Sequence, residues 1–467
     1  MRLADCDGRI SRELAVNGRS LWCLFGATTI RTPPMTDRKI EFKKLTQDEV
    51  DAICARHERL WSGRSGGARA NFSYTILENM VLANRDLSDA DFSGAVLRGA
   101  VLSGATLNSA VFFAADLRRA NLEGASLRRA DLRGAIMRGA NLTGADLTEA
   151  DMREGAIAQM DKEKGLAVLT HKTQENDAGT ANFTGANLSH SKMAGIAAQK
   201  ADFTDAMLLG TRLIRANLRG SSFQGANLEG ADMSGADLSD TDFTHAVLIG
   251  TKTVMAKTQG MNTDGALTNA AVGIDPEALE QPVADQIAEH VRWCETNGKE
   301  GKPSLFDGTD LRGLTSLAGK TLTAFHARGA TLYGLDLEGA QLQGARLEKA
   351  DLRMVSLRGA DLRGADLTGA NLSNADLRDC QLGPLLLDGN RVLPASLAGV
   401  RARYTDLRGA DLRQLKATGA DFSYATLNGT NVKRASFNGS CFTGARIDED
   451  FSTQVDSLDG AVDLDAA

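Results

Sequence analysis

The most regular feature of the chain is a bulky apolar residue at every fifth position. From residue 90 to residue 150 every fifth residue is alanine, and a large apolar side chain follows two positions after each alanine. The positions that flank this large residue are mostly Asp, Asn, Ser, Thr and Arg. A period of five fits neither an amphipathic helix, with its period of about 3.6, nor the alternation of an ordinary half-buried strand.

A second period, four times as long, lies over the first. Phenylalanine replaces the large residue at every fourth pentad in two separate segments, at Phe72, Phe92, Phe112 and at Phe183, Phe203, Phe223, Phe243. Four pentads in one square coil explain both periods, because successive coils then stack about 4.8 Å apart, the spacing of paired strands. The pattern predicts that the large residues and the alanines point inward. It also predicts that the phenylalanine rings form structural core columns.

The pentads resemble those of the pentapeptide-repeat family, whose consensus reads A-(D/N)-L-x-x. Residues 360–364 read ADLRG and residues 365–369 read ADLTG, and the resemblance covers most of residues 70–447. It implies an all-β solenoid, a right-handed quadrilateral β-helix of about 20 residues per coil. It implies little about function, because this family is united by its structure and not by one chemistry.

Breaks in the repeat predict the domain organisation. Residues 46–260 are expected to form a helix-capped solenoid with an insert at 158–180, and residues 304–447 a second solenoid. Residues 261–303 are expected to form a linker and a second capping helix. Helical apolar patterns precede both solenoids, at Gln47–Ser62 and Pro276–Asn297. An open solenoid end exposes apolar side chains and unpaired strand edges, so we expect these helices to cap two tandem solenoids.

Neither end of the chain shows the full repeat. Residues 1–45 are expected to be a poorly structured extension, with Met35 as an alternative start, because the sequence from Met35 leads directly into the first helix. Residues 448–467 contain seven acidic residues and no basic residue, so they are expected to form a disordered, solubilising tail.

The chain offers little catalytic chemistry. The six histidines lack HExxH spacing, and the glycine-rich pentads lack the strand–loop–helix setting of a phosphate-binding loop. The six cysteines show no paired spacing, which favours a reducing compartment over a zinc site or a disulfide framework. No apolar run approaches the roughly 18 residues of a membrane span. We therefore expect a cytoplasmic protein that is not an enzyme and needs no cofactor or metal.

The distribution of charge argues against the best-known activity of the family. The resemblance implies that an acidic solenoid can mimic duplex DNA and modulate DNA gyrase. Here residues 71–157 carry a net charge of −2, residues 181–250 of −2 and residues 304–447 of +4, so the repeats sum to zero. Asp before the central leucine is often matched by Arg after it, as in Asp116 and Arg118. A neutral solenoid lacks the field that mimicry requires, so topoisomerase modulation is kept as the alternative.

Two sets of outward positions are candidate interaction surfaces. Arg98, Arg118 and Arg138 recur at the longer of the two periods, one in each successive coil, so they should form a ladder on one face that can engage anions. No aromatic residues interleave with them as single-strand binding would favour, so nucleic acid is not the expected partner.

The second set is apolar and outward-facing. It comprises Val96, Val101 and Phe113 in the first solenoid and Leu386 and Leu393 in the second. A contiguous apolar patch would mark a contact with a partner or with a second copy of the chain. The sequence thus predicts an interaction or scaffold protein with an unidentified protein partner, and a homodimer is one such assembly.

Overall fold

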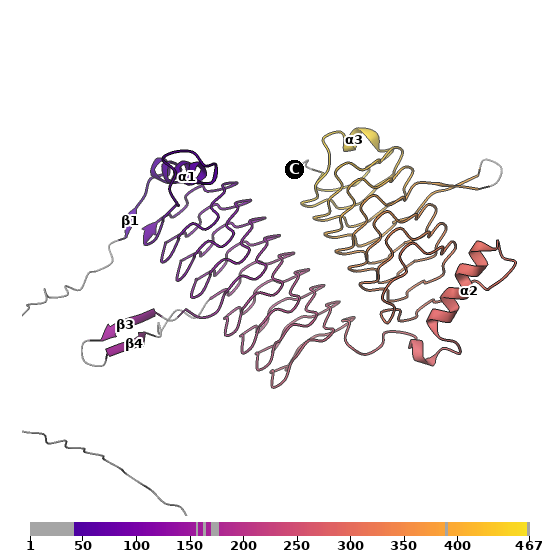
Figure 1. The fold of residues 1–467 in the computed structure, drawn as a ribbon, viewed down its shortest axis with the longest axis horizontal. Coiled ribbons are helices and arrows are strands. Elements are labelled where there is room, and N and C mark those ends of the chain that lie inside the picture. The colour runs from indigo at the N-terminus through magenta and orange to yellow at the C-terminus, as the bar shows by residue number, and fades with distance from the viewer. Residues whose placement is uncertain (1–41, 156, 162–164, 170–176, 388–390, 465–467) are drawn as a thin grey trace, which may run out of the picture. The chain divides into compact units, whose positions relative to one another are not determined.

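The protein is built from stacked four-sided coils. The computed structural model describes residues 42–155, 157–161, 165–169, 177–387 and 391–464 (Figure 1). Each side of a coil makes one parallel bridge to the coil before it and one to the coil after it, as Asp91 does with Asn71 and Val111. The expectation for residues 1–41, including Met35 as a start, lies outside the described residues.

Backbone hydrogen bonds hold each side of a coil between its two neighbours. Phe92 N donates to Val111 O at 2.7 Å in the next coil, and Asp91 N donates to Ala70 O at 3.1 Å in the previous one. Ala95 N donates to Phe92 O at 3.0 Å and closes the corner. The corner residue itself, here Gly94 with a φ of 61°, adopts the left-handed conformation that favours glycine.

Phenylalanine rings stack in two columns inside the first solenoid. The rings of Phe72, Phe92 and Phe112 lie 4.7–5.0 Å apart between centroids, and those of residues 183, 203, 223 and 243 lie 4.7–4.8 Å apart. All are fully buried. The bridge from Asn141 to Asn182 sets Phe183 over Leu142, two sides around the coil from the first column. The two columns therefore line opposite sides of the coil.

The insert between the two phenylalanine segments leaves the stack continuous. Ile136 bridges to Asp177 and Asp151 bridges to Lys192, where the regular repeat would place positions 156 and 171. Within the insert, β3 (Ile157–Asp161) pairs antiparallel with β4 (Gly165–Leu169). Figure 1 shows this hairpin projecting from the coils. The inserted segment is one longer than a whole number of pentads, which explains why the pentad frame shifts by one.

A helix stands at the start of the first series of coils. α1 (Gln47–Trp61) begins after Thr46, whose side chain forms a reciprocal capping box with Glu49. Val50 and Cys54 of this helix belong to the same buried apolar cluster as Phe72. Just before the helix, β1 (Lys43–Lys44) pairs in parallel with β2 (Thr75–Ile76) of the first coil. The coils of this series continue to the bridge between Val247 and Leu267.

A second helix stands at the start of the second series of coils. The short 3-10 helix η1 (Pro276–Ala278) leads to α2 (Val283–Glu295), which buries Ile287 in a second apolar cluster with Phe306. Ile274 bridges to Thr309 of the first coil, and the bridges between the coils of this series begin with Leu305 and His326. Figure 1 shows α1 and α2 each at the beginning of its own series.

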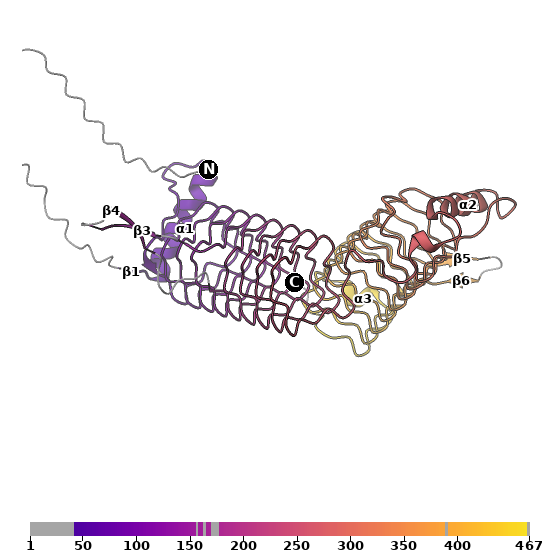
Figure 2. The ribbon, with the colours of Figure 1, turned by 90° about the horizontal axis from the view of Figure 1, so that it is seen from below.

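The second series is interrupted by a short hairpin. Asp366 bridges to Ser396, where the regular repeat would place position 386, so this coil is longer than the others by two pentads. The added segment contains β5 (Leu385–Leu386) and β6 (Val392–Leu393), which pair antiparallel. The hairpin extends away from the coils in Figure 2.

The acidic C-terminal segment differs from the disordered tail expected from its charge. Residues 448–464 are described, and α3 (Phe451–Gln454) buries Phe451 at a centroid distance of 5.4 Å from Phe437. Ser457 and Val462 bridge to Ser436 and Cys441 of the preceding coil. The segment is ordered because an aromatic side chain and one further partial coil cover the end of the core. Residues 465–467 lie outside the described part.

Candidate interaction surfaces

The three arginines of the predicted ladder lie on one face of the first solenoid. Arg98, Arg118 and Arg138 line a single hollow of about 610 Å³, together with Arg119 and Glu78. Their side chains are 39–62 % exposed. The structure thus brings together the basic residues that the longer sequence period grouped.

Carboxylates neutralise most of this ladder. Asp116 Oδ2 lies 2.6 Å from both Arg98 Nε and Arg118 Nη2, and Asp177 Oδ2 lies 3.5 Å from Arg138 Nη1. Burial raises the pKa of Asp116, but the hydrogen bonds from Arg118 and Arg98 outweigh it, and the pKa lies below its ordinary value. The carboxylate therefore stays ionised at neutral pH, and the face presents alternating charges instead of a purely basic strip.

The same pairing recurs around both solenoids. The guanidinium two positions after an Asp returns to it through two hydrogen bonds, for example from Arg363 Nε at 2.9 Å and Arg363 Nη2 at 2.6 Å to the Asp361 carboxylate. Exposed pairs of this type contribute about 0–1 kcal/mol each. Their main consequence is that the outward faces carry little net field.

The apolar candidates do not form one patch. Val96 and Val101 are half-buried on adjacent sides of the first solenoid. Phe113 is covered by the guanidinium of Arg133, whose Cζ lies 5.6 Å from the ring centroid. Leu386 and Leu393 lie on the β5–β6 hairpin of the second solenoid, and their exposed fractions are 71 % and 39 %. They belong to a separate surface.

The two solenoids share a contact surface that the sequence did not predict. Arg403 Nη1 of the second solenoid lies 3.0 Å from Asp205 Oδ2 of the first, and Asp205 is only 5 % exposed. Next to this pair, the Tyr404 hydroxyl lies so close to Gly185 that a Cβ at that position would collide with it. Tyrosine at an outward position, where most pentads carry a small or charged residue, was the available signal.

A second tyrosine joins the solenoids through hydrogen bonds. The Tyr333 hydroxyl donates to Glu229 Oε2 at 2.9 Å and accepts from Asn227 Nδ2 at 2.8 Å. Burial, followed by the charge of Glu229, raises the pKa of Tyr333 well above its ordinary value. The phenol therefore remains a hydrogen-bond donor at any physiological pH.

The two solenoids run in opposite directions along this surface. Arg353 donates to the carbonyl oxygen of His245, and Arg403, two coils further along the second solenoid, meets Asp205, two coils back along the first. The two solenoids are therefore not coaxial, because coaxial solenoids could not make both contacts.

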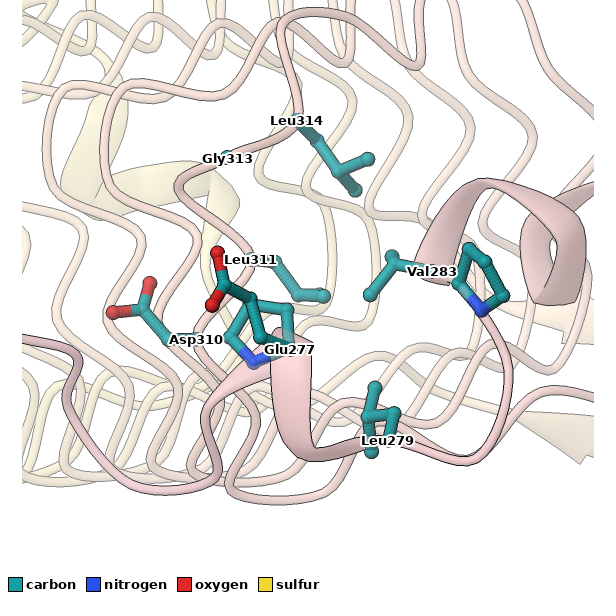
Figure 3. Close-up of a pocket in the computed structure, with 9 residues that line it drawn as sticks. Glu277, Leu279, Val283, Asp310, Leu311, Gly313 and Leu314 are labelled. Atoms are coloured by element: carbon teal, nitrogen blue, oxygen red, sulfur yellow. The ribbon is translucent and has the colours of Figure 1, made fainter.

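An apolar hollow of about 370 Å³ lies at the start of the second solenoid (Figure 3). Leu279, which directly follows η1, and Val283 of α2 line one side, and Leu311 and Leu314 line it from the first coil. Asp310 at its edge is held by Arg312, with Oδ2 2.5 Å from Nη2. Among the described residues no group of three or more His, Cys, Asp or Glu could hold a metal ion. The hollow thus offers mainly apolar contact, with the carboxylates of Glu277 and Asp310 beside it.

A family model, pentapeptide repeats, matches the chain in overlapping and adjoining segments that together cover more than half of it: residues 68–104, 86–112, 115–153, 181–220, 221–252, 321–353, 345–382, 395–434 and 418–449. The chain belongs to the pentapeptide-repeat family. Pentapeptide-repeat proteins fold as right-handed quadrilateral β-helices, which agrees with the four-sided coils described above.

Several solved structures of pentapeptide-repeat proteins are similar to this one. One is full-length QnrB1, a plasmid-mediated fluoroquinolone resistance protein, with 20 % identity over 43 % of this chain and 92 % of that chain and a TM-score of 0.24. Another is HetL of Nostoc sp. strain PCC 7120, involved in heterocyst differentiation regulation, with 22 % identity over 88 % and 96 % and a TM-score of 0.14. No curated protein sequence matches the chain. In the described part of this pentapeptide-repeat protein, no helix is long and apolar enough to cross a membrane.

Proposed function

We propose that this protein is a non-enzymatic scaffold that presents long, flat faces to a protein partner. The observation that supports it best is the face lined by Arg98, Arg118 and Arg138. Each successive coil contributes one of these arginines, and carboxylates alternate with them. Such a face offers many weak, regularly spaced polar contacts. Charged groups of this kind favour a complementary partner more by selectivity and encounter rate than by affinity.

The buried thiols support a place in a reducing compartment, which we propose is the cytoplasm. Cys54 and Cys380 are buried in the core and, like the other described cysteines, are free. Burial raises the pKa of Cys54 to about 11, so at neutral pH this thiol is neither a thiolate nucleophile nor a metal ligand.

The alternative proposal, modulation of a topoisomerase by DNA mimicry, receives less support from the charges. DNA presents an uninterrupted row of anionic groups, whereas here many carboxylates along both solenoids are paired with arginines, as in Asp131 with Arg133 and Asp376 with Arg378. A gyrase supercoiling assay separates the two proposals. A neutral scaffold leaves supercoiling unchanged, while inhibition or protection of gyrase would favour the alternative.

The scaffold proposal is tested by partner capture with two matched charge-reversal variants. The first changes Arg98, Arg118 and Arg138 to Glu. The second changes Arg358, Arg378 and Arg408, which form an equivalent ladder of three successive coils in the second solenoid. Tagged proteins are captured from native lysate, and co-purifying proteins are quantified by mass spectrometry.

We expect a specific partner to be enriched with the unaltered protein and with the second variant, and to fall by about tenfold or more with the first. If both variants retain the partner, the face of Arg98 is not the docking surface. If no protein is enriched above a tag-only control, the scaffold proposal itself fails.

A further inference from the structure

A second basic hollow lies where the two solenoids meet. It measures about 360 Å³ and is lined by His245 and Gly265 of the first solenoid and by Lys349, Arg353 and Arg401 of the second, with Asp351 as its only acidic residue. This volume falls within the range of about 300–1,000 Å³ that is typical of small-molecule sites. Three cations and one carboxylate give the lining a net charge of two positive units before His245 is considered.

The carboxylate of this hollow, that of Asp351, is already paired with an arginine. Asp351 accepts hydrogen bonds from Arg353 Nε at 2.9 Å and Arg353 Nη2 at 2.6 Å. The Arg353 side chain is 7 % exposed and also donates to the carbonyl oxygen of His245, which fixes it across the boundary between the solenoids. Burial raises the pKa of Asp205, and the charges of Arg403 and Arg401 oppose that rise. The Asp205 carboxylate pairs with Arg403, whose Nη1 lies 3.0 Å from Asp205 Oδ2. The acidic groups near the hollow are thus engaged by other arginines.

Two cations remain available at the same hollow. Within the described part of the chain, Lys349 and Arg401 form no ion pair, although both line the hollow and both are exposed. Asn371, which also lines it, uses Oδ1 to accept from Ser373 N at 3.1 Å, so its amide nitrogen is free to donate. An ammonium, a guanidinium and an amide together form a donor set for an anion with several oxygens.

We propose that this hollow binds a small, doubly charged oxyanion: phosphate, or the phosphate group of a small phosphorylated compound. The positive charge of Lys349 and Arg401 matches the two negative charges of such a group. Because His245 and Gly265 belong to the other solenoid, the bound anion touches both solenoids. Binding therefore stabilises the folded chain, as any ligand does that binds the folded state and not the unfolded one. This site is separate from the face of Arg98 and does not depend on the proposed function.

The test uses the full chain in a buffer without phosphate, at constant ionic strength. Inorganic phosphate and phenyl phosphate are titrated by calorimetry against sodium chloride as the reference, and the melting temperature is followed in parallel. The double variant Lys349→Gln, Arg401→Gln removes both free cations. The matched control Arg346→Gln, Arg434→Gln removes two exposed arginines that do not line the hollow.

We expect phosphate-dependent heat and a rise in melting temperature for the unaltered protein and for the control variant. We expect affinity to be weaker by about tenfold or more in the Lys349, Arg401 variant, because each lost contact to a charged group weakens binding by about that factor. Equal binding of both probes indicates the free anion as ligand, and preference for phenyl phosphate indicates a phosphate monoester. The proposal is overturned if neither probe binds better than chloride, or if the double variant binds like the control while its unliganded melting temperature is unchanged.

Discussion

The corner residue of each pentad decides where the repeat can continue. It lies two positions after the central residue and is left-handed, as for Gly359 with a φ of 64° and Asn374 with a φ of 60°. Proline cannot adopt this conformation, because its ring fixes φ near about −65°. Pro384 occupies the corner after Leu382, and there the chain leaves the coil for the β5–β6 hairpin. A single residue thus explains the interruption.

Two histidines, one in α1 and one in α2, accept the same type of hydrogen bond from the backbone. His57 Nδ1 accepts from Ala70 N at 3.0 Å, and His290 Nδ1 accepts from Ser304 N at 3.0 Å. Both residues are fully buried. In each case a ring nitrogen satisfies a backbone amide where the chain passes from the helix into the coils. The interaction requires an unprotonated Nδ1.

We predict a pH dependence of stability that originates at His290. Burial lowers the pKa of His290 below its ordinary value. Above about pH 6.5 the ring is neutral in both states, but below it the unfolded chain takes up a proton that the folded chain resists. The melting temperature, measured by circular dichroism, should therefore fall between about pH 7.5 and pH 5.5.

The variant His290→Asn keeps an acceptor for Ser304 N and removes the titration. Its melting temperature should be lower overall because the imidazole packing is lost, but its fall over the same pH range should be smaller than that of the unaltered protein. His57 is present in both proteins, so the difference between the two profiles isolates His290. Parallel profiles would show that this histidine is not the titrating group.

At the scale of elements, the period of five predicted the sides of the coil, the inward positions and the insert. It could do so because every side repeats the same packing requirement: alanine beside a large residue, then a corner. The first helix was also predicted near its observed limits, because its apolar positions follow a helical period, whereas the second begins at Val283 and not at Pro276. Their role as caps is our inference from Val50 and Ile287, which join the buried clusters of the first and second series.

The C-terminal segment forms a partial coil, and not a disordered tail, for an identifiable reason. Residues 457–461 read SLDGA, which matches a pentad. However, Ser457 bridges to Ser436, whereas the regular repeat would pair it with Phe437. This pentad is therefore one residue out of frame. The prediction of a disordered tail rested on composition, because this segment contains seven acidic residues. Charge on outward positions does not prevent a coil when Phe451 and the inward positions are apolar.

We predict that the β5–β6 hairpin can be removed without loss of the second solenoid. Deletion of residues 385–394, combined with Pro384→Gly at the corner, restores the regular spacing between bridged partners. The shortened protein should keep its melting temperature within a few degrees, because the described residues of the hairpin contribute exposed leucines and none of the buried core. It should also aggregate less, since Leu386 is 71 % exposed.

Thermal unfolding measures the melting temperature, and light scattering measures aggregation. The control is the same deletion with Pro384 retained. The control should be less stable, because proline cannot form the left-handed corner. Equal stability of the two deletions would contradict the role assigned to Pro384.

At the scale of the whole chain, the contact between the solenoids could not be predicted from the repeat. Every outward face obeys the same pentad rule, so periodicity cannot indicate which face of one solenoid meets which face of the other. The contact depends instead on a few exceptions to the rule, such as Tyr333 and Tyr404, and on arginines that look like all the others in the sequence. Arg353 and Arg403 are distinguished only by their burial against the other solenoid.

The pair of Asp205 and Arg403 provides the sharpest test of this arrangement. Burial raises the pKa of Asp205 and the charges of Arg403 and Arg401 oppose that rise, so the carboxylate depends on its partner for compensation. Asp205→Lys places two cations together at a site where Asp205 was 5 % exposed, and Arg403→Glu places two carboxylates there. Each single change should loosen the contact, because an uncompensated buried charge is strongly unfavourable.

The double variant Asp205→Lys, Arg403→Glu restores an opposite pair and should recover most of the loss. We expect a coupling of about 1–3 kcal/mol in a double-mutant cycle from urea unfolding. The radius of gyration from small-angle X-ray scattering should increase in each single variant and return in the double variant. Asp240→Lys is the matched control, because Asp240 shares the left-handed corner conformation but pairs with Arg219 on an exposed surface. Independent effects of the two changes, with an unchanged radius, would mean that the solenoids are held together by the tyrosine contacts and not by this ion pair.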